Sequence, residues 1–159
     1  MAASPVKFLS AHWPYVVVVA LGAAGVSALL LLGGADGANA DDPKQVAFGR
    51  TVYAEHCAAC HGENLEGQPE WRVRKADGKL PAPPHDETGH TWHHPDGQLF
   101  ALTKHGLQAA AGGNYVTEMP AFAGRLSDAE IWAVLAYIKS RWPAEIRERQ
   151  SARRASPDS

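Results

Sequence analysis

Cysteine and methionine are scarce in this chain, which has two of each among its 159 residues. Two cysteines allow one disulfide or one two-sulfur attachment site, and they exclude a small fold held by several disulfides. Basic residues are not in excess either, since 15 Lys and Arg stand against 17 Asp and Glu. Without a basic surplus to neutralise phosphates, we expect no nucleic-acid partner. Internal repeats and strand-like alternation are also missing, so the sequence predicts an all-α fold.

One long uncharged stretch lies at the start of the chain. No charged residue occurs from Pro14 to Ala35, and roughly 20 apolar residues in a helix match the ~30 Å hydrocarbon thickness of a bilayer. We therefore expect residues 1–35 to form a single transmembrane anchor. Lys7 precedes the stretch and Asp36 follows it. The positive-inside rule then places the anchor in the inner membrane and the rest of the chain in the periplasm or on the outer face.

A cleaved signal peptide is the alternative interpretation of the same segment. Ala38-Asn39-Ala40 has the small-x-small form of a cleavage site, and cleavage would follow Ala40. The uncharged stretch is longer than the roughly 7–15 residues typical of the apolar part of a signal peptide, which favours the anchor. Both interpretations export the remainder of the chain.

Three amphipathic segments predict helices in the exported part. The first runs from Lys44 to Cys57 and the second from Pro95 to His105. The third begins at Ser127-Asp128-Ala129-Glu130, a capping box in which Ser and Glu satisfy the first free N–H groups, and it runs to Trp142. The predicted divisions are a linker at 36–43, a folded domain at 44–143, and a charged tail at 144–159 that is expected to form a frayed helix followed by disorder.

Both cysteines lie in one motif, Cys57-Ala58-Ala59-Cys60-His61. Two thiols three positions apart on a helical turn can form thioether bonds with the two vinyl groups of one haem, and the adjacent His61 can then bind the iron. A thioredoxin-like pair would need a βαβ context, and a structural zinc site would need a second pair of ligands. The motif therefore predicts one covalently attached haem c, bound by Cys57 and Cys60 with His61 as an axial ligand, and no other cofactor.

Met119 is the predicted second axial ligand of the iron. It is the only methionine besides the initiator, and Pro120 follows it in a loop before the last helix. A proline restrains the backbone of the loop that must present the sulfur. A thioether ligand favours Fe(II) over Fe(III) and so raises the reduction potential.

From Gln45 to Trp142 the chain resembles a class I c-type cytochrome, in particular the membrane-anchored bacterial monohaem proteins of that family. The resemblance rests on the Cys57–His61 motif near the start, on Met119-Pro120 near the end, and on the amphipathic helices at both ends. It implies a fold of about three to four helices around one haem. It also implies a close crossing of the first and last helices, where Gly49 and Tyr53 match one side and Val134 and Tyr137 match the other.

The resemblance also implies further haem contacts. In the family, a proline carbonyl accepts the N–H of the proximal imidazole and fixes the orientation of its ring. Pro83 and Pro84 are the preferred candidates, and the choice between them stays open. The following stretch, His85 to His94, is similar to a loop of the membrane-anchored proteins. In it, Trp92 or a neighbouring histidine is expected to donate a hydrogen bond to a haem propionate.

Five histidines fall within twenty-one residues: His85, His90, His93, His94 and His105. A copper or zinc site is one interpretation, because imidazole suits both metals. The favoured interpretation is a loop packed around the haem edge.

Three functions correspond to these interpretations of the haem motif and the histidines. A one-electron carrier in a respiratory or related electron-transfer chain is expected, with redox partners of unknown identity, because six-coordinate iron leaves no open position for a substrate. A haem subunit of a larger oxidoreductase complex is compatible with the same interpretation. A peroxidase would need such an open position, and a metal-delivery module would use the histidines.

Overall fold

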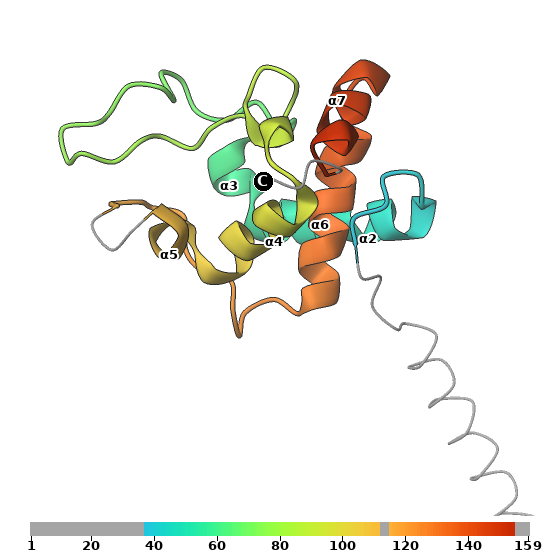
Figure 1. The fold of residues 1–159 in the computed structure, drawn as a ribbon. Helices are drawn as coiled ribbons and strands as arrows, with labels where there is room; N and C mark the ends of the chain where they lie inside the picture. The colour runs from blue at the N-terminus through green and yellow to red at the C-terminus, as the bar shows by residue number, and fades with distance from the viewer. Residues whose placement is uncertain (1–36, 112–114, 155–159) are drawn as a thin grey trace, which may run out of the picture. The chain divides into compact units, whose positions relative to one another are not determined.

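The computed structural model describes residues 37–111 and 115–154 (Figure 1). Its helices are α2 (Pro43–His56), α3 (Ala58–His61), the 3₁₀ helix η1 (Thr91–His93), α4 (Asp96–His105), α5 (Leu107–Ala111), α6 (Asp128–Ser140) and α7 (Ala144–Arg154). These two ranges contain no strand beyond one isolated bridge, so the predicted all-α class is confirmed for them. None of the helices described is both long and apolar enough to cross a bilayer. The anchor predicted at 1–35 lies outside the described residues.

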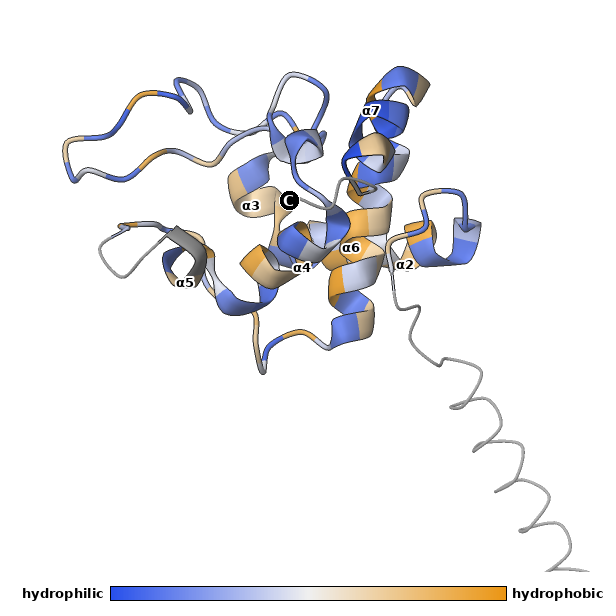
Figure 2. Cartoon of the chain, viewed as in Figure 1, coloured by the Kyte–Doolittle hydropathy of each residue, from blue (hydrophilic) through white to orange (hydrophobic). Residues whose placement is uncertain are grey.

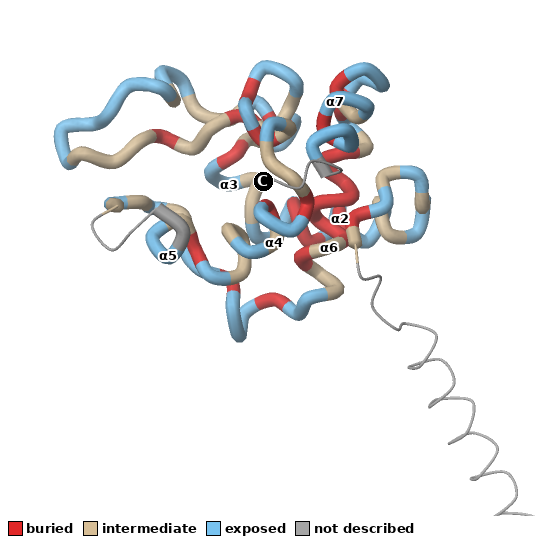
Figure 3. The backbone as a smooth tube through the Cα atoms, viewed as in Figure 1, coloured by how far each residue is buried: buried red, intermediate tan, exposed pale blue. Residues whose placement is uncertain are grey.

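Helices α2 and α6 cross closely in the buried centre of the fold (Figure 3). A Cβ placed on Gly49 would collide with the backbone carbonyl of Ala133 and would lie 3.0 Å from Cβ of Tyr137. Only glycine therefore permits this approach. Beside the crossing, the rings of Tyr53 and Tyr137 pack with their centroids 5.3 Å apart. The expected crossing is confirmed, although Ala133 and Tyr137 lie nearest to Gly49 and Val134 faces the cavity described below.

Side-chain caps define where both of these helices begin. Ser127 Oγ accepts the N–H of Glu130, and the Glu130 carboxylate accepts the N–H of Ser127, as the capping box predicts. At the start of α2, the Asp42 carboxylate accepts the N–H of Lys44 at 2.9 Å. Figure 2 shows that α6 is mainly hydrophobic, and most of its residues from Ile131 onward are buried. The packing of α6, more than its caps, therefore anchors the fold.

Helix α4 matches its prediction, whereas the shortest helices were not foreseen. It begins one residue after the expected Pro95 and ends where Gly106 adopts a φ of 86°, a conformation that favours glycine. The elements α3, α5 and η1 span only 4, 5 and 3 residues. Segments this short contain too few positions to show a helical period.

The C-terminal segment forms helix α7 over Ala144–Arg154, so the helix expected at the start of the tail is present and is longer and better packed than a frayed end. The helix is mostly hydrophilic (Figure 2), but Ile146 and Gln150 are 8% and 1% exposed. Gln150 Nε2 donates to Asp96 Oδ1 at 2.6 Å and to the His94 carbonyl at 3.2 Å. Two buried side chains one helical turn apart give α7 a packed face despite its charge. The remainder of the predicted tail lies outside the described residues.

The predicted linker belongs to the fold from Gly37 onward. Ala38 is buried, and its carbonyl accepts a hydrogen bond from Lys139 Nζ at 3.2 Å. The same ammonium group pairs with the Asp96 carboxylate at 2.7 Å, and the side chains of both residues are less than a tenth exposed. A buried charge must be both paired and hydrogen-bonded. The Ala38 carbonyl therefore supplies a hydrogen bond that the buried Lys139 ammonium group needs in addition to its ion pair.

Candidate functional site

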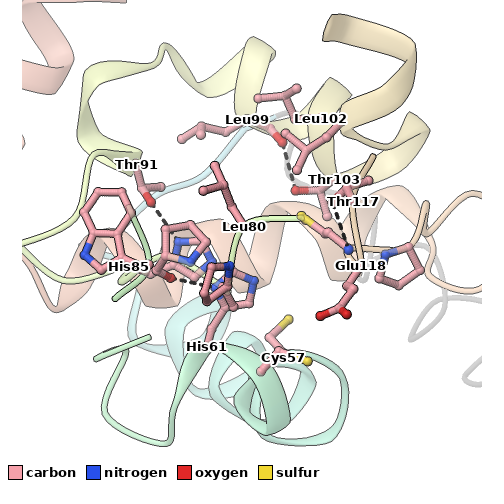
Figure 4. Close-up of a pocket in the computed structure, with 18 of the residues that line it drawn as sticks. Cys57, His61, Leu80, His85, Thr91, Leu99, Leu102, Thr103, Thr117 and Glu118 are labelled. Atoms are coloured by element: carbon pink, nitrogen blue, oxygen red, sulfur yellow. Dashed lines mark hydrogen bonds between the residues drawn. The ribbon is translucent and has the colours of Figure 1, made fainter. Parts of the chain in front are cut away.

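A cavity of about 310 Å³ lies between helices α3, α4 and α6 and the segments 68–94 and 115–120 (Figure 4). The four side chains predicted to attach and ligate haem all line it, although they are up to sixty-two residues apart in the sequence: Cys57, Cys60, His61 and Met119. The fold therefore brings the sulfur and imidazole groups of the motif and the distant methionine to one site.

Both cysteines are free thiols in the described structure. Burial, together with the neighbouring Cys60, raises the pKa of the Cys57 thiol to about 11. A redox-active cysteine needs a lowered pKa, because the thiolate is the nucleophile. The environment of Cys57 therefore disfavours a thioredoxin-like function. It is compatible with a thiol that takes part in covalent attachment at the wall of an apolar cavity.

His61 is buried at the end of α3, and its ring is oriented by the backbone of the proline segment. Nδ1 lies 2.9 Å from the Pro83 carbonyl oxygen. A carbonyl can only accept a hydrogen bond, so Nδ1 carries the hydrogen and Nε2 keeps its lone pair for a metal. Burial lowers the pKa of His61, and the Pro83 contact partly opposes that shift. Burial is the larger of the two effects, so the net shift favours the neutral imidazole, the form that binds iron.

Two glycines that the sequence analysis did not identify hold the proline segment in place. Gly67 adopts a φ of 68°, and a Cβ there would collide with the backbone between Pro83 and Pro84. A Cβ on Gly89 would collide with the carbonyl of Pro84. Of the two candidate prolines, Pro83 contacts the imidazole and Pro84 is buried against Gly89. Only the tertiary structure reveals this packing, since both glycines are in loops without a recognisable turn motif.

Met119 is partly buried and packs against the hydrophobic core. Its backbone N–H donates to Thr117 Oγ1 at 3.0 Å, which fixes the turn that precedes Pro120. The walls around it are apolar and come from α4 and α6, with Phe122 added from the loop before α6: Leu99, Leu102, Val134, Leu135 and Ile138. A flat apolar group as large as a porphyrin would bury its faces against these side chains.

Polar side chains line another part of the same cavity. His85 stacks on His61 with ring centroids 4.0 Å apart, and its Nδ1 lies 2.7 Å from Thr91 Oγ1 (Figure 4). His90 stacks on Trp71 at 5.6 Å, and His94 also lines the cavity. Burial and the neighbouring imidazoles lower the pKa of His85 well below its usual value and also lower that of His90. These rings are therefore neutral donors or acceptors.

Trp92 is not among the residues that line the cavity. Its indole N–H donates to the Glu87 carbonyl at 3.3 Å, and its ring packs on His93. The tryptophan in the cavity wall is Trp71, which the sequence analysis overlooked because it lies in a loop without periodicity. The Trp92 indole N–H is thus engaged outside the cavity, and a hydrogen bond from Trp92 or a neighbouring histidine to a haem propionate stays a prediction.

Although His85, His90 and His94 line one cavity, the histidines of this stretch do not converge on a common metal position. His93 is exposed, and His94 Nδ1 lies 3.2 Å from Gln98 Oε1. Within residues 37–111 and 115–154, no three His, Cys, Asp or Glu side chains are arranged to hold a metal ion. The structure thus gives no support to a copper or zinc site in this loop.

Comparison with known proteins identifies the family. The cytochrome c family model matches residues 46–142. The chain belongs to the cytochrome c family. Membership implies a covalently bound haem c and a role in haem-based electron transfer. The donor set agrees with this cofactor, because two thiols, a neutral imidazole and a thioether surround an apolar cavity.

Three curated relatives contain a similar segment. The chain is 36% identical to a thiosulfate dehydrogenase of Stutzerimonas stutzeri over 97 residues, which cover 60% of this chain and 27% of that protein. It is 34% identical over 99 residues to the Cbb3-type cytochrome c oxidase subunit CcoP of Azospirillum sp., 62% of this chain and 29% of the relative. The chain is also 36% identical to CcoP of Azospirillum brasilense over 90 residues, which cover 57% of this chain and 26% of that protein. The similarity thus covers less than a third of each relative. No solved structure gives a significant match.

Proposed function

We propose that this cytochrome transfers single electrons through one haem, attached to Cys57 and Cys60 and ligated by His61 and Met119. The observation that supports this most directly is the convergence of these four side chains on one apolar cavity. When bound, haem supplies an iron that alternates between Fe(II) and Fe(III). With both axial positions taken by protein ligands, no position is left for a substrate, so a carrier is favoured over an enzyme.

The protein groups around the cavity would set the properties of the iron. The Pro83 carbonyl keeps the His61 ring in one tautomer and one orientation, and such an outer contact increases the basicity of a ligating imidazole. The Met119 thioether favours the reduced state. The leucine side chains from α4 and α6 keep water away from the site, which strengthens every electrostatic interaction within it. Each contribution comes from a different element of the fold.

The polar wall of the cavity suits the two carboxylates of a haem. Buried carboxylates need hydrogen-bond donors, and the imidazoles of His85 and His90 and the indole of Trp71 line this wall. His85 Nδ1 is engaged with Thr91, so its Nε2 is the nitrogen left for such a contact. We assign to Trp71 the donor role that the sequence suggested for Trp92.

The proposed location is the inner membrane, with residues 1–35 as a single-pass anchor and the haem domain in the periplasm. The uncharged stretch and its flanking charges support this location. Two of the relatives are oxidase subunits and one is a dehydrogenase, so a place beside redox partners agrees with their names. A respiratory electron-transfer chain is the proposed context.

Replacing the methionine tests the ligation. In the full-length holoprotein, Met119→Ala should keep the covalent haem, lower the reduction potential and let added imidazole bind the oxidised iron. Loss of the sulfur should also change the absorption spectrum of the oxidised protein. An unchanged potential and spectrum would remove Met119 as a ligand. Loss of covalent haem from Cys57→Ser with Cys60→Ser is the companion test of attachment.

A further inference from the structure

Glu118 precedes Met119 and pairs with a distant part of the chain. Its carboxylate lies 2.7 Å from Lys75 Nζ and 3.6 Å from Lys79 Nζ. More than forty residues separate Glu118 from Lys75. The ion pairs therefore join the segment that presents the sulfur to the protruding loop between His61 and the proline segment, which is the long green loop in Figure 1.

The two lysines come from one preformed turn. The N–H of Lys75 donates to the Lys79 carbonyl at 2.9 Å, and the N–H of Lys79 donates to Asp77 Oδ1 at 3.1 Å. The guanidinium of Arg74 donates to the Gly78 carbonyl at 2.6 Å. Because the backbone is already ordered, both ammonium groups can meet one carboxylate at a smaller entropic cost than two independent side chains.

The joined segments are also walls of the cavity. Leu80, directly after the turn, and Trp71, before it, line the cavity from one loop, while Thr117 and Glu118 line it from the other (Figure 4). A second contact reinforces the connection, because the guanidinium of Arg74 lies 5.9 Å from the ring centroid of Tyr115. The charges of Glu118, Lys75 and Lys79 therefore connect the two loops at the cavity.

We propose that Glu118 is a positioning residue for Met119, acting through Lys75 and Lys79. The ion pairs hold the methionine loop against the protruding loop, so the thioether stays on the iron and competing ligands are kept out. This inference rests on the ligation by Met119 given under Proposed function. The side chain of Glu118 does not itself bind the iron.

Solvent exposure limits the size of the effect and provides a test by salt. The three side chains are 30–49% exposed, and exposed pairs of this kind change an equilibrium by about two- to fivefold. Ion pairs at a surface are screened by salt, with a Debye length of about 10 Å at 0.1 M and 3 Å at 1 M. The contribution of Glu118 should therefore fall as ionic strength rises.

The experiment is a spectrophotometric titration of the oxidised full-length holoprotein with imidazole. Glu118→Gln should bind imidazole about two- to fivefold more tightly than the natural protein at low salt, and the difference should vanish near 1 M salt. The double variant Lys75→Met with Lys79→Met should increase the affinity for imidazole to a similar extent. Combining these two substitutions with Glu118→Gln should increase the affinity little further, because all three remove the same ion pairs. Lys104→Met is the control. Lys104 Nζ lies 2.7 Å from Asp128 Oδ1, an equally short ion pair, and this pair does not involve the two loops.

Met119→Ala in the same titration separates failure of this inference from failure of the proposed function. If the natural protein binds imidazole as tightly as Met119→Ala, the methionine is not a ligand, and both proposals fall. If Met119→Ala binds much more tightly but Glu118→Gln matches the natural protein, only the positioning role of Glu118 is overturned. Fully additive effects of the glutamate and lysine substitutions would overturn it as well.

Discussion

The α2–α6 pair and the walls of the cavity are stabilised in different ways. The helix pair satisfies its backbone internally and buries aliphatic and aromatic side chains at a crossing that only Gly49 allows. The walls formed by 62–90 and 115–120 contain few long-range backbone hydrogen bonds, such as those from His85 to Leu65 and from Gln68 to Ala82. Many of their apolar side chains face the cavity, although Leu65 belongs to the buried core. The helices can therefore support themselves, whereas the loops depend on the cofactor between them.

Removing the attachment sites should produce the largest difference between the two regions. In Cys57→Ser with Cys60→Ser, covalent haem is lost, and the cavity walls lose the surface against which they pack. Amide hydrogen exchange should then accelerate strongly in 62–90 and 115–120 and much less in α2 and α6, because local stability follows buried contacts. Equal protection of the loops with and without haem would contradict the comparison.

Lys139→Met should have the next largest effect and should act on the whole fold. It leaves the Asp96 carboxylate buried without its cation, and breaking a buried pair in this way costs about 3–5 kcal/mol. Urea unfolding of the holoprotein followed by circular dichroism measures the loss. Lys104→Met, which breaks an exposed pair, should cost less than about 1 kcal/mol. A small loss for Lys139→Met would mean that water reaches the Asp96 carboxylate.

Gly49→Ala tests the crossing of the helix pair. The added methyl group would collide with the Ala133 carbonyl, and overpacking of this kind costs about 1–3 kcal/mol. Gly97→Ala is a matched control in α4, since nothing lies within 4 Å of its Cβ position. That control should leave stability unchanged or raise it by about 0.5–1 kcal/mol. Equal unfolding free energies for the two variants would show that the crossing tolerates a side chain.

Trp71→Phe should have the smallest effect and should be confined to the cavity. Loss of an N–H donor near a haem carboxylate would remove about 1 kcal/mol of hydrogen bonding. Only the part of this energy that differs between Fe(II) and Fe(III) shifts the potential, so the reduction potential should fall by less than about 40 mV for a one-electron couple. Trp92→Phe is the control, because its indole N–H donates to the Glu87 carbonyl. Redox titration should show the shift for Trp71→Phe alone. A shift only in Trp92→Phe would restore the original assignment.

The sequence predicted the helix pair and the ligands better than the surrounding loops. Periodicity and caps placed α2, α4 and α6 within a few residues, because these signals are local. The Cys57–His61 motif is equally local, and Met119 could be found because so few methionines exist. Local signals do not reveal which tryptophan faces a cavity, so Trp71 was missed and Trp92 was chosen.

The sequence did not reveal how the two ends of the described chain pack, for a related physical reason. A strongly charged segment normally indicates solvent exposure, yet α7 packs through Ile146 and Gln150. Gln150 is buried only because Asp96 and the His94 carbonyl accept its hydrogen bonds. The polar linker was misjudged in the same way, since the Ala38 carbonyl is needed by a lysine 101 residues away. Such partners are known only once the chain has folded.

Intact mass spectrometry of the denatured, acid-extracted chain tests the central claim most directly. The account predicts a polypeptide that retains the mass of one haem after extraction, with Cys57 and Cys60 both resistant to alkylation. The same spectrum shows whether residues 1–40 are still present. A mass equal to the polypeptide alone, with two thiols that react with an alkylating agent, would contradict covalent attachment and the function built on it.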